Sequence, residues 1–175
     1  YKKLIEIDID LLTQCLIRTK DNKIVKTEVK EINTQHYNFK DWEFNWVEES
    51  KKRNKILGLF AENDKRLQGI VEYYENKERQ LLEVVLVEIA PFNNRHNPKN
   101  FLKNKEYLGV GGHLFAEIAR ISFEKGYDGY VSFLAKTNLI EHYKKTLGAK
   151  QLSYIEMYID DEAAMKLVKK YYGKN

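Results

Sequence analysis

The sequence is poor in the residues that cross-link a chain or break its regular structure. Its 175 residues include one cysteine, Cys15, and two prolines. A single cysteine excludes an internal disulfide framework and any zinc site built from several cysteines, and it is typical of a reducing compartment. No apolar run approaches the roughly 18 residues of a membrane span, and no signal peptide is recognisable. We therefore expect a cytoplasmic protein without a membrane partner.

A strong excess of one charge is also lacking. The chain carries 30 Lys and Arg against 26 Asp and Glu, for a net charge of +4, and both signs are interspersed. This excess is too small to favour nucleic acid as a partner, although the loop over residues 95–105 is basic. With 43% hydrophobic residues and no repeat, linker or low-complexity tract, residues 1–175 are predicted to form one globular domain.

Alternating side chains predict strands near the N-terminus. Residues 4–12 alternate apolar and acidic side chains, which is typical of a half-buried strand. Residues 15–19 and 24–32 predict the two arms of a hairpin around the polar turn at residues 20–23.

An aromatic-rich stretch follows at residues 36–52. Phe39, Trp42 and Trp46 recur there at helical spacing, which predicts an amphipathic helix. Its aromatic side chains either pack in the core or face a substrate.

Three apolar runs then predict an antiparallel meander over residues 56–61, 67–75 and 81–90. The turns between them are short and polar. The third run is almost continuously apolar, which indicates a central strand covered on both faces. After a long loop, the chain predicts a helix ending near Lys125 before Gly126, with Leu114, Ile118 and Ile121 on one face.

The C-terminal part alternates strands and helices, predicted at residues 129–135, 138–147, 151–160 and 161–172. Asn138 with Glu141 resembles a capping box, and Gly148 ends that helix.

The glycine-rich stretch at residues 106–115 carries the clearest chemical signal. Gly109, Gly111 and Gly112 stand just before a predicted helix, where free backbone N–H groups attract anions. A P-loop is excluded because His113 and Leu114 follow the last glycine in place of Lys and Ser/Thr. A dinucleotide-binding turn fits poorly because Leu114 occupies its third glycine position and the sheet before it is an antiparallel meander.

The C-terminal two-thirds, residues 56–160, resembles the GNAT superfamily of acyl-CoA N-acyltransferases. The motifs that carry the resemblance are Pro91, the loop 109–114 (Gly-Val-Gly-Gly-His-Leu), Gly126, Asn138 and the segment 142–149 (His-Tyr-Lys-Lys-Thr-Leu-Gly-Ala). The resemblance implies an α/β (α+β) GNAT fold: a mixed, mostly antiparallel central sheet with helices on both faces, here with an added N-terminal strand and hairpin. Residues 1–54 would then supply much of the acceptor side, 55–160 the acyl-CoA-binding core and 161–175 a C-terminal helix.

The resemblance also implies acetyl-CoA as acyl donor, with no metal. Its pyrophosphate would bind the backbone amides of Leu108, Gly109, Val110, Gly111, Gly112 and His113. The pantetheine arm would lie in a gap between the strands at 81–90 and 129–135, in contact with Ile89 and Ala90. A free backbone N–H near residues 87–90 would polarise the carbonyl. Asn138 matches a cofactor-contacting asparagine, although capping alone would explain it.

Two departures from the family pattern concern the cofactor mouth. The family's Gln/Arg position holds Glu106, whose charge opposes a pyrophosphate unless it points away or Lys103 and Lys105 offset it. Residues 93–105 form an insertion that is either a substrate lid carrying Arg95, His96 and Lys99 or a solvated loop.

The reacting groups follow from the chemistry of acyl transfer. Tyr143 matches the family's tyrosine, which would protonate the leaving thiolate, and packing on one helical stripe is the alternative. Glu88 and then Glu83 are the candidates for the general base, or else each pairs with a lysine. In regular strand geometry the two glutamates face opposite sides of the sheet, unless a bulge intervenes. His36 and His96 lack partners at metal-ligand spacing, so no metal site is predicted.

The predicted function is an N-acetyltransferase that moves an acetyl group from acetyl-CoA to a primary amine by direct transfer. The acceptor, a small molecule or a peptide, is not specified by the sequence, and a homodimer is left open. The alternative is a non-catalytic CoA-binding or partner-binding module on a GNAT fold, which Glu106 favours.

Overall fold

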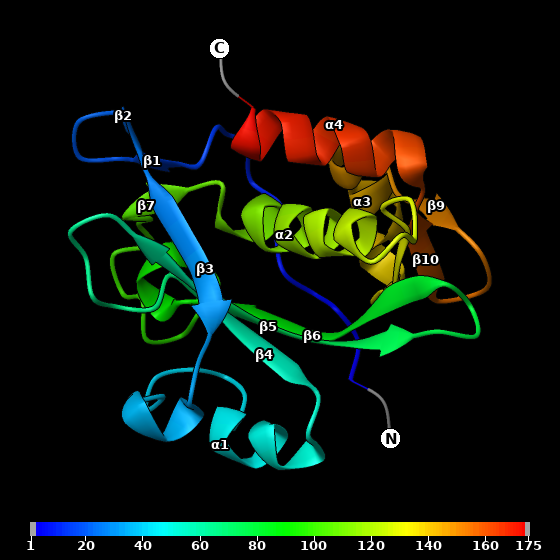
Figure 1. Cartoon of the computed structure of the whole chain (residues 1–175). Helices are drawn as coiled ribbons and strands as arrows, with labels where there is room; N and C mark the ends of the chain where they lie inside the picture. The colour runs from blue at the N-terminus through cyan, green and yellow to red at the C-terminus, as the bar shows by residue number, and fades with distance from the viewer. Residues whose placement is uncertain (1–2, 174–175) are drawn as a thin grey trace.

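A computed structural model describes residues 3–173 of the chain. A seven-stranded sheet forms its centre (Figure 1). Its strands, in spatial order, are β3 (Thr27–Glu31), β4 (Lys55–Ala61), β5 (Gly69–Asn76), β6 (Leu81–Ile89), β8 (Val131–Leu134), β10 (Glu156–Ile159) and β9 (Lys150–Gln151). Neighbouring strands pair antiparallel except β6 and β8, which are parallel. The predicted meander is therefore confirmed as β4, β5 and β6.

A second, small sheet forms above one end of the first, in the order β2 (Lys23–Val25), β1 (Leu16–Arg18) and β7 (Tyr107–Leu108). The pairing of Leu16 with Val25 confirms the predicted N-terminal hairpin. Its second arm is shorter than predicted, because the chain leaves the hairpin after Val25 and continues as β3 at the edge of the main sheet.

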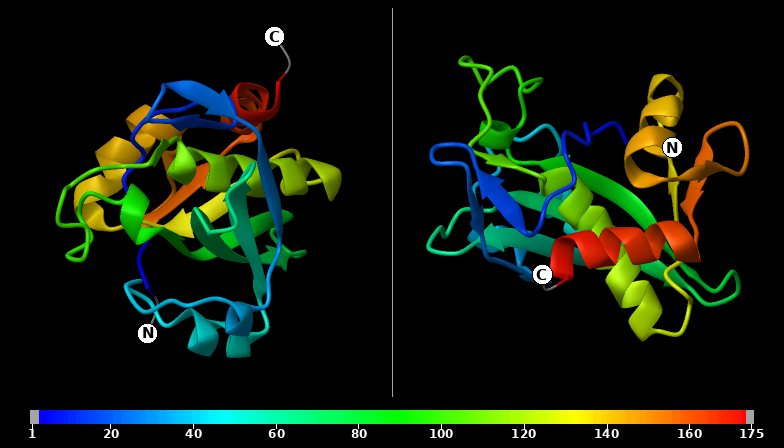
Figure 2. Two further views of the ribbon diagram at one scale, coloured as in Figure 1. Left: turned by 90° about the vertical axis from the view of Figure 1, so that its left-hand side faces the viewer. Right: turned by 90° about the horizontal axis from the view of Figure 1, so that it is seen from above.

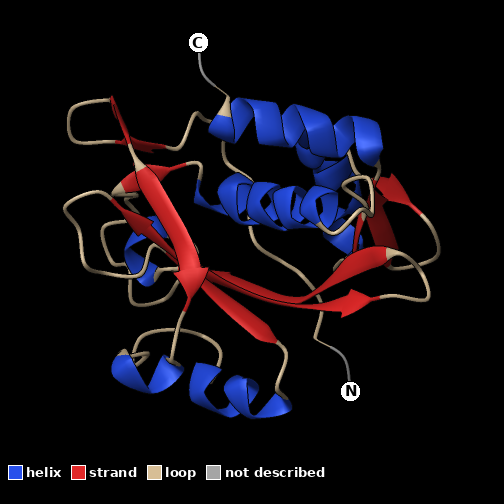
Figure 3. Cartoon of the chain, viewed as in Figure 1, coloured by secondary structure: helices blue, strands red, loops and turns tan. Residues whose placement is uncertain are grey.

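Helices cover both faces of the main sheet, as predicted (Figures 1 and 3). The α-helices are α1 (Trp46–Glu49), α2 (Val110–Glu124), α3 (Ile140–Leu147) and α4 (Asp161–Tyr172), and short 3₁₀ helices are η1 (Thr34–His36), η2 (Ser50–Lys52), η3 (Pro91–Asn93) and η4 (Thr137–Leu139). In Figure 1, α2 and α4 lie above the sheet and α1 below it. Gly126 at φ +83° and Gly148 at φ +69° follow α2 and α3 in the left-handed conformation that ends helices. None of the described helices is both long and apolar enough to span a membrane.

Two hydrophobic clusters enclose the sheet. The larger one joins α2, α3 and α4 to one side, with Leu114, Phe115 and Ile118 at most 1% exposed. The smaller one, on the α1 side, is built on Trp46, Ile56, Ile70 and Leu86. Alternate residues of β6 enter the two clusters, which is why this strand is almost continuously apolar.

The stretch at residues 36–52 is not the single helix that was predicted. It consists of η1, an irregular loop, the four-residue α1 and η2. The Asn38 side chain accepts a hydrogen bond from the Lys40 amide in a local turn, and the Asn45 side chain accepts from the Glu48 amide as the N-cap of α1, so the helix begins only at Trp46. The expectation that the aromatics pack in the core holds for Trp46, which is fully buried, with Phe39 and Trp42 packed around its cluster.

Two smaller expectations also differ. Residues 151–160 form the hairpin β9–β10 rather than one strand. Asn138 lies within η4, and neither η4 nor α3 has a side-chain N-cap, so the capping box is absent and Glu141 pairs with Lys144 instead.

Residues 3–13, here called the N-terminal segment, are extended but form a single β-bridge, between Ile5 and Ala135. Their burial alternates as the sequence predicts, with Ile5, Ile7 and Ile9 inside. The segment lacks a ladder because it crosses the molecule beneath α2, from β8 to the start of that helix, instead of following a strand edge (Figure 2).

Candidate functional site

A groove opens where β6 and β8 separate. The two strands pair only from Leu82 to Val84 with Val131 to Phe133. Beyond that point β6 continues to Ile89 without β8 beside it, and Val87, Glu88 and Ile89 line a pocket. The splayed pair that the family resemblance implied is therefore present.

The N-terminal segment occupies this groove. The Ile5 N–H donates to Leu134 O at 2.7 Å, and the Lys136 N–H donates to Ile5 O at 3.0 Å, which adds one step of pairing to the end of β8. Further along, the Ile9 N–H donates to His142 Nε2 at 3.0 Å. Part of the region predicted to serve the acceptor thus lies between the two strands.

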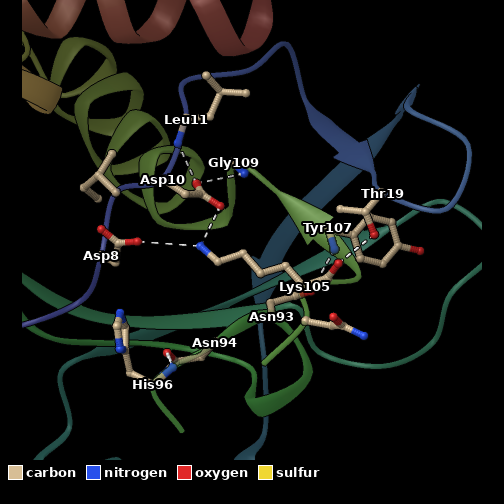
Figure 4. A network of polar contacts seen from close by, with 12 residues as sticks. Asp8, Asp10, Leu11, Thr19, Asn93, Asn94, His96, Lys105, Tyr107 and Gly109 are labelled. Atoms are coloured by element: carbon tan, nitrogen blue, oxygen red, sulfur yellow. Dashed lines mark hydrogen bonds and ion pairs between the residues drawn. The ribbon is translucent and has the colours of Figure 1, made fainter. Parts of the chain in front are cut away.

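At the other end of the groove the segment meets the start of α2 (Figure 4). Gly109 precedes the helix at φ +93°, and its N–H donates to Asp10 Oδ1 at 3.2 Å. Lys105 Nζ lies 3.0 Å from Asp10 Oδ2 and 3.7 Å from Asp8 Oδ2, and the lysine side chain is only 6% exposed. A carboxylate therefore occupies the position at a helix N-terminus that suits an anion.

The glycines themselves are closely packed by this arrangement. A Cβ on Gly111 would lie 3.0 Å from Ile9 Cδ1 and 3.1 Å from Ile7 Cδ1. A Cβ on Gly112 would lie 2.3 Å from the hydroxyl of Tyr171, which itself donates to Gly109 O at 2.9 Å. Contacts with the N-terminal segment and with α4 thus require small residues here, independently of any ligand.

The remaining residues predicted for the pyrophosphate loop have structural contacts. Leu108 pairs with Ile17 in the small sheet, and Val110 is buried in the core. His113 is fully buried, its Nε2 lies 2.7 Å from Thr27 Oγ1, and burial lowers its pKa to about 4. The His113 side chain is therefore neutral, and only its backbone belongs to the helix start.

Glu106 points away from the helix start. Its carboxylate accepts two hydrogen bonds from Arg66, at 2.8 and 3.1 Å, and Arg66 also holds Asp64. Arg66 and Lys105 thus each pair with two carboxylates at this end of the groove.

Tyr143 projects from α3 into the middle of the groove. Its hydroxyl donates to Ile7 O at 2.7 Å, and the side chain is completely buried against Phe133. Burial, reinforced by the charges of Glu6 and Asp8, raises the pKa of Tyr143. The phenol proton is therefore retained and is held by the N-terminal segment.

Glu88 lies on the far wall of the same groove. Its carboxylate accepts hydrogen bonds from the Glu43 N–H at 2.7 Å, the Phe44 N–H at 3.2 Å and Trp46 Nε1 at 2.8 Å. Burial raises the pKa of Glu88, and these three donors act against that rise.

Glu83 lies on the same face of the sheet as Glu88. The register of β5 and β6 shifts at Val85, and Ile70 and Tyr74 on β5 face Glu88 and Glu83, respectively. Because of this bulge, Glu83 and Glu88 do not face opposite sides of the sheet as they would in a regular strand. Glu83 nevertheless lines a separate pocket of about 350 Å³ and accepts from Tyr74 and Asn76.

The other predicted cofactor contacts are placed as follows. Ile89 lines the groove, whereas the Ala90 N–H donates to Gln68 O at 3.0 Å and so is not a free donor. Asn138 is exposed on η4.

Beside residues 6–8 the groove widens into a pocket of about 600 Å³. Carboxylates line it, together with the Trp42 and Phe44 rings and with His96 and Lys99 from the 93–105 insertion; the acidic residues are Glu6, Asp8, Asp41, Glu43 and Glu88. The Asn97 side chain donates to Asp41 O at 3.0 Å and ties the insertion to the opposite wall. Within residues 3–173, no group of three or more potential metal ligands is gathered.

Sequence reasoning missed three residues of this site. Asp10 appeared only as part of an alternating strand, Lys105 only as a charge near Glu106, and Tyr171 only as part of a helix. The sequence signal for Asp10 was the acidic side chain at alternate positions of residues 4–12. Such alternation specifies which face of the segment is buried, but it does not specify which element covers that face.

Comparison with solved structures shows the fold. A bacterial toxin superposes with a TM-score of 0.55 at 12% identity, over 87% of this chain and 100% of that one. An acetyltransferase from Bacillus subtilis in complex with CoA gives 0.48 at 15% identity, over 78% and 98%. Mutant forms of the spermidine/spermine N-acetyltransferase SpeG from Vibrio cholerae give 0.45 at 14% identity, over 80% and 96%. No protein-family model and no curated protein matches the sequence.

The mixed, mostly antiparallel sheet with its parallel β6–β8 pair agrees with the fold that the motifs predicted. At these identities the likeness concerns the fold alone.

Proposed function

We propose that the protein is an acyl-CoA-dependent N-acyltransferase that transfers an acetyl group from acetyl-CoA to a primary amine. One observation carries the proposal. The groove between β6 and β8 connects an anion site at Gly109 and Lys105, a buried tyrosine at its middle and a pocket bordered by Glu88. These are the groups that a thioester donor and an amine acceptor require, in the order in which they would be used.

The residues at the α2 end suit a CoA pyrophosphate. The Gly109 N–H and the Lys105 ammonium already hold a carboxylate, and Glu106 is paired with Arg66. Helix-start amides, from residues 108–113, and a buried cation favour an anion of higher charge even more strongly. The arm of the donor would follow the groove past Ile89 toward Tyr143.

In the transfer, the amine nitrogen bonds to the thioester carbonyl carbon and the carbon–sulfur bond breaks. Tyr143 would give its proton to the departing thiolate. Because the pKa of Tyr143 is raised, this transfer requires that the hydroxyl and the thiolate sulfur be adjacent. Glu88, or a water molecule beside it, would take the proton that the ammonium must lose. Glu83 lies in another pocket, so it is the weaker choice of base.

The pocket suits a cationic acceptor. Its lining includes five carboxylates against Lys40, Lys99 and His96, and the Trp42 and Phe44 rings can pack on an alkyl chain or an ammonium group. A small molecule and an exposed peptide amine both remain compatible with this lining.

The test is a screen of primary amines with acetyl-CoA, followed by Tyr143→Phe on any acceptor found. We expect turnover to fall about 100-fold, as for loss of a general acid, with acetyl-CoA affinity little changed. Ser132→Ala, elsewhere on β8, is the control. Unchanged turnover in Tyr143→Phe would remove this residue from its proposed role.

A second function is favoured by the filled groove. If the N-terminal segment never leaves, the chain is a non-catalytic module on a GNAT fold whose ligand is a partner at the open pocket. Such a protein would not bind acetyl-CoA under any condition that keeps it folded.

A further inference from the structure

We propose that the N-terminal segment and acyl-CoA are alternative occupants of one groove, and that Lys105 is the cation that binds the anion of either occupant. This inference rests on the acyltransferase function proposed above. It adds that the enzyme is closed by its own chain until residues 3–13 move aside.

The segment matches the donor in the order of its chemical groups. An acyl-CoA presents an anion, then an extended arm that carries amides, then a sulfur. The segment presents the Asp10 carboxylate at the start of α2, then an extended backbone, then Ile7 O against the Tyr143 hydroxyl. Both occupants therefore need the same three places on the protein.

The charge of Lys105 supports this exchange. The side chain is 6% exposed with the segment docked, and its ion-pair partners are the carboxylates of Asp8 and Asp10. When the segment leaves, this ammonium loses both partners, and a pyrophosphate in the groove would replace them with charge-assisted hydrogen bonds. Displacement of the segment is thus favoured when a pyrophosphate takes its place, and disfavoured when nothing does.

The fixation of the segment at both ends explains why the closed state is preferred. Lys3 Nζ lies 2.6 Å from Glu49 Oε1 at one end, and Asp10 is held at the other. Between them, Ile5, Ile7 and Ile9 are buried. A donor that must first displace these contacts binds with an affinity reduced by the fraction of molecules that are open.

The limited backbone pairing of the segment allows it to leave without opening either sheet. It forms one β-bridge, and the chain after it is fixed separately by the pairing of β1 with β2 and β7. While it is docked, the Tyr143 proton is directed to Ile7 O. Release would therefore free the donor site and the proposed acid together.

Calorimetry with acetyl-CoA tests the proposal on the full chain. Asp10→Ala removes the carboxylate anchor and should bind acetyl-CoA about tenfold more tightly than the wild type. Asp21→Ala, which removes an exposed carboxylate paired with Arg18, is the matched control and should bind as the wild type does. Ile9→Ala weakens the same segment by packing alone and should also tighten binding.

Lys105→Met separates the two parts of the proposal. If Lys105 binds the pyrophosphate as well as the segment, adding Lys105→Met to Asp10→Ala should weaken acetyl-CoA binding about tenfold. If Lys105 serves only the segment, Lys105→Met alone would tighten binding as Asp10→Ala does, and its assignment would be wrong.

Amide hydrogen exchange of residues 5–12, measured with and without acetyl-CoA, distinguishes failure of the alternative occupancy from failure of the proposed acyltransferase function. We expect bound acetyl-CoA to remove the protection of the Ile5 and Ile9 amides. Wild-type binding with both amides still protected would refute the alternative occupancy and leave the acyltransferase intact. Unprotected amides in Asp10→Ala without any binding would refute the acyltransferase itself, and with it this inference.

Discussion

The two ends of the groove differ in what fills them. At the α2 end the glycines, Lys105 and Tyr171 enclose the N-terminal segment. At the other end, beside Glu88 and the 93–105 insertion, a pocket of about 600 Å³ is open to ligands. The proposed acceptor side is thus open, whereas the proposed donor side is filled by the N-terminal segment.

This contrast locates the step at which activity would be controlled. An open acceptor pocket needs no rearrangement to receive an amine, but a donor must compete with side chains that belong to the hydrophobic core. Access of the donor, rather than of the acceptor, should therefore limit the reaction.

The largest effect is expected behind the wall of the open pocket, where Trp46 holds Glu88. Trp46→Ala removes a fully buried indole and the Nε1–H that donates to Glu88, so the free energy of unfolding should fall by about 3–5 kcal/mol. Urea unfolding measures this change. Trp42→Ala, at a half-buried aromatic in the loop before α1, should cost less than half as much. Equal losses would show that Trp46 does not support the pocket.

The closed end can be tested in the same way. Ile9 is 2% exposed, so Ile9→Ala should lower the free energy of unfolding by about 2–4 kcal/mol. Ile24→Ala, at an exposed position of β2, should change it by less than about 0.5 kcal/mol. If urea unfolding gave the two variants the same small effect, the N-terminal segment would not be part of the folded core.

The anchor of the segment at Glu49 predicts a pH effect. Burial raises the pKa of Glu72 to about 7, and its hydrogen-bonded neighbour Glu49 adds to this. Although burial opposes it, hydrogen bonds from Glu72, Lys3 and Lys52 lower the pKa of Glu49 to about 2. A proton thus rests on Glu72 while Glu49 is ionised and holds Lys3.

Because its pKa is raised from 4.5, Glu72 contributes its full stability below about pH 4.5 and loses it as the pH rises through 7. Glu72→Gln keeps a donor toward Glu49 at every pH. It should match the wild type near pH 5 and exceed it by about 1–2 kcal/mol at pH 8.5, in urea unfolding. Glu31→Gln, at an exposed site, is the control. Parallel pH profiles for Glu72→Gln and the wild type would exclude the shared proton.

The smallest effect is expected at Glu106. Because this carboxylate is about half exposed and bonded to Arg66, Glu106→Gln should change stability by less than about 0.5 kcal/mol. In the Asp10→Ala background it should alter acetyl-CoA affinity less than about threefold. A tenfold gain in calorimetry would show instead that Glu106 opposes the pyrophosphate.

Strong periodicity made most of the fold predictable. The apolar run of β6, the stripe of α2 and the glycines after α2 and α3 each had one consistent interpretation, and all were confirmed. The single helix predicted over residues 36–52 was wrong because Asn38 forms a local turn and Asn45 caps the helix only at Trp46.

The site was less predictable, for a physical reason. Gly111 and Gly112 fit a phosphate at a helix start, and they equally fit the close packing of Ile9 and Tyr171. The sequence pattern alone does not separate these causes, since both require the absence of a Cβ. The segment that fills the groove lies about 100 residues before Gly109 in the chain. No local sequence pattern encodes such a long-range contact.

The most direct measurement is the structure of the Asp10→Ala variant crystallised with acetyl-CoA. We expect acetyl-CoA to lie between β6 and β8 with its pyrophosphate at Gly109 and Lys105, and residues 5–10 to lie outside the groove. Residues 5–10 still seated between the strands, with acetyl-CoA absent or bound elsewhere, would contradict this expectation.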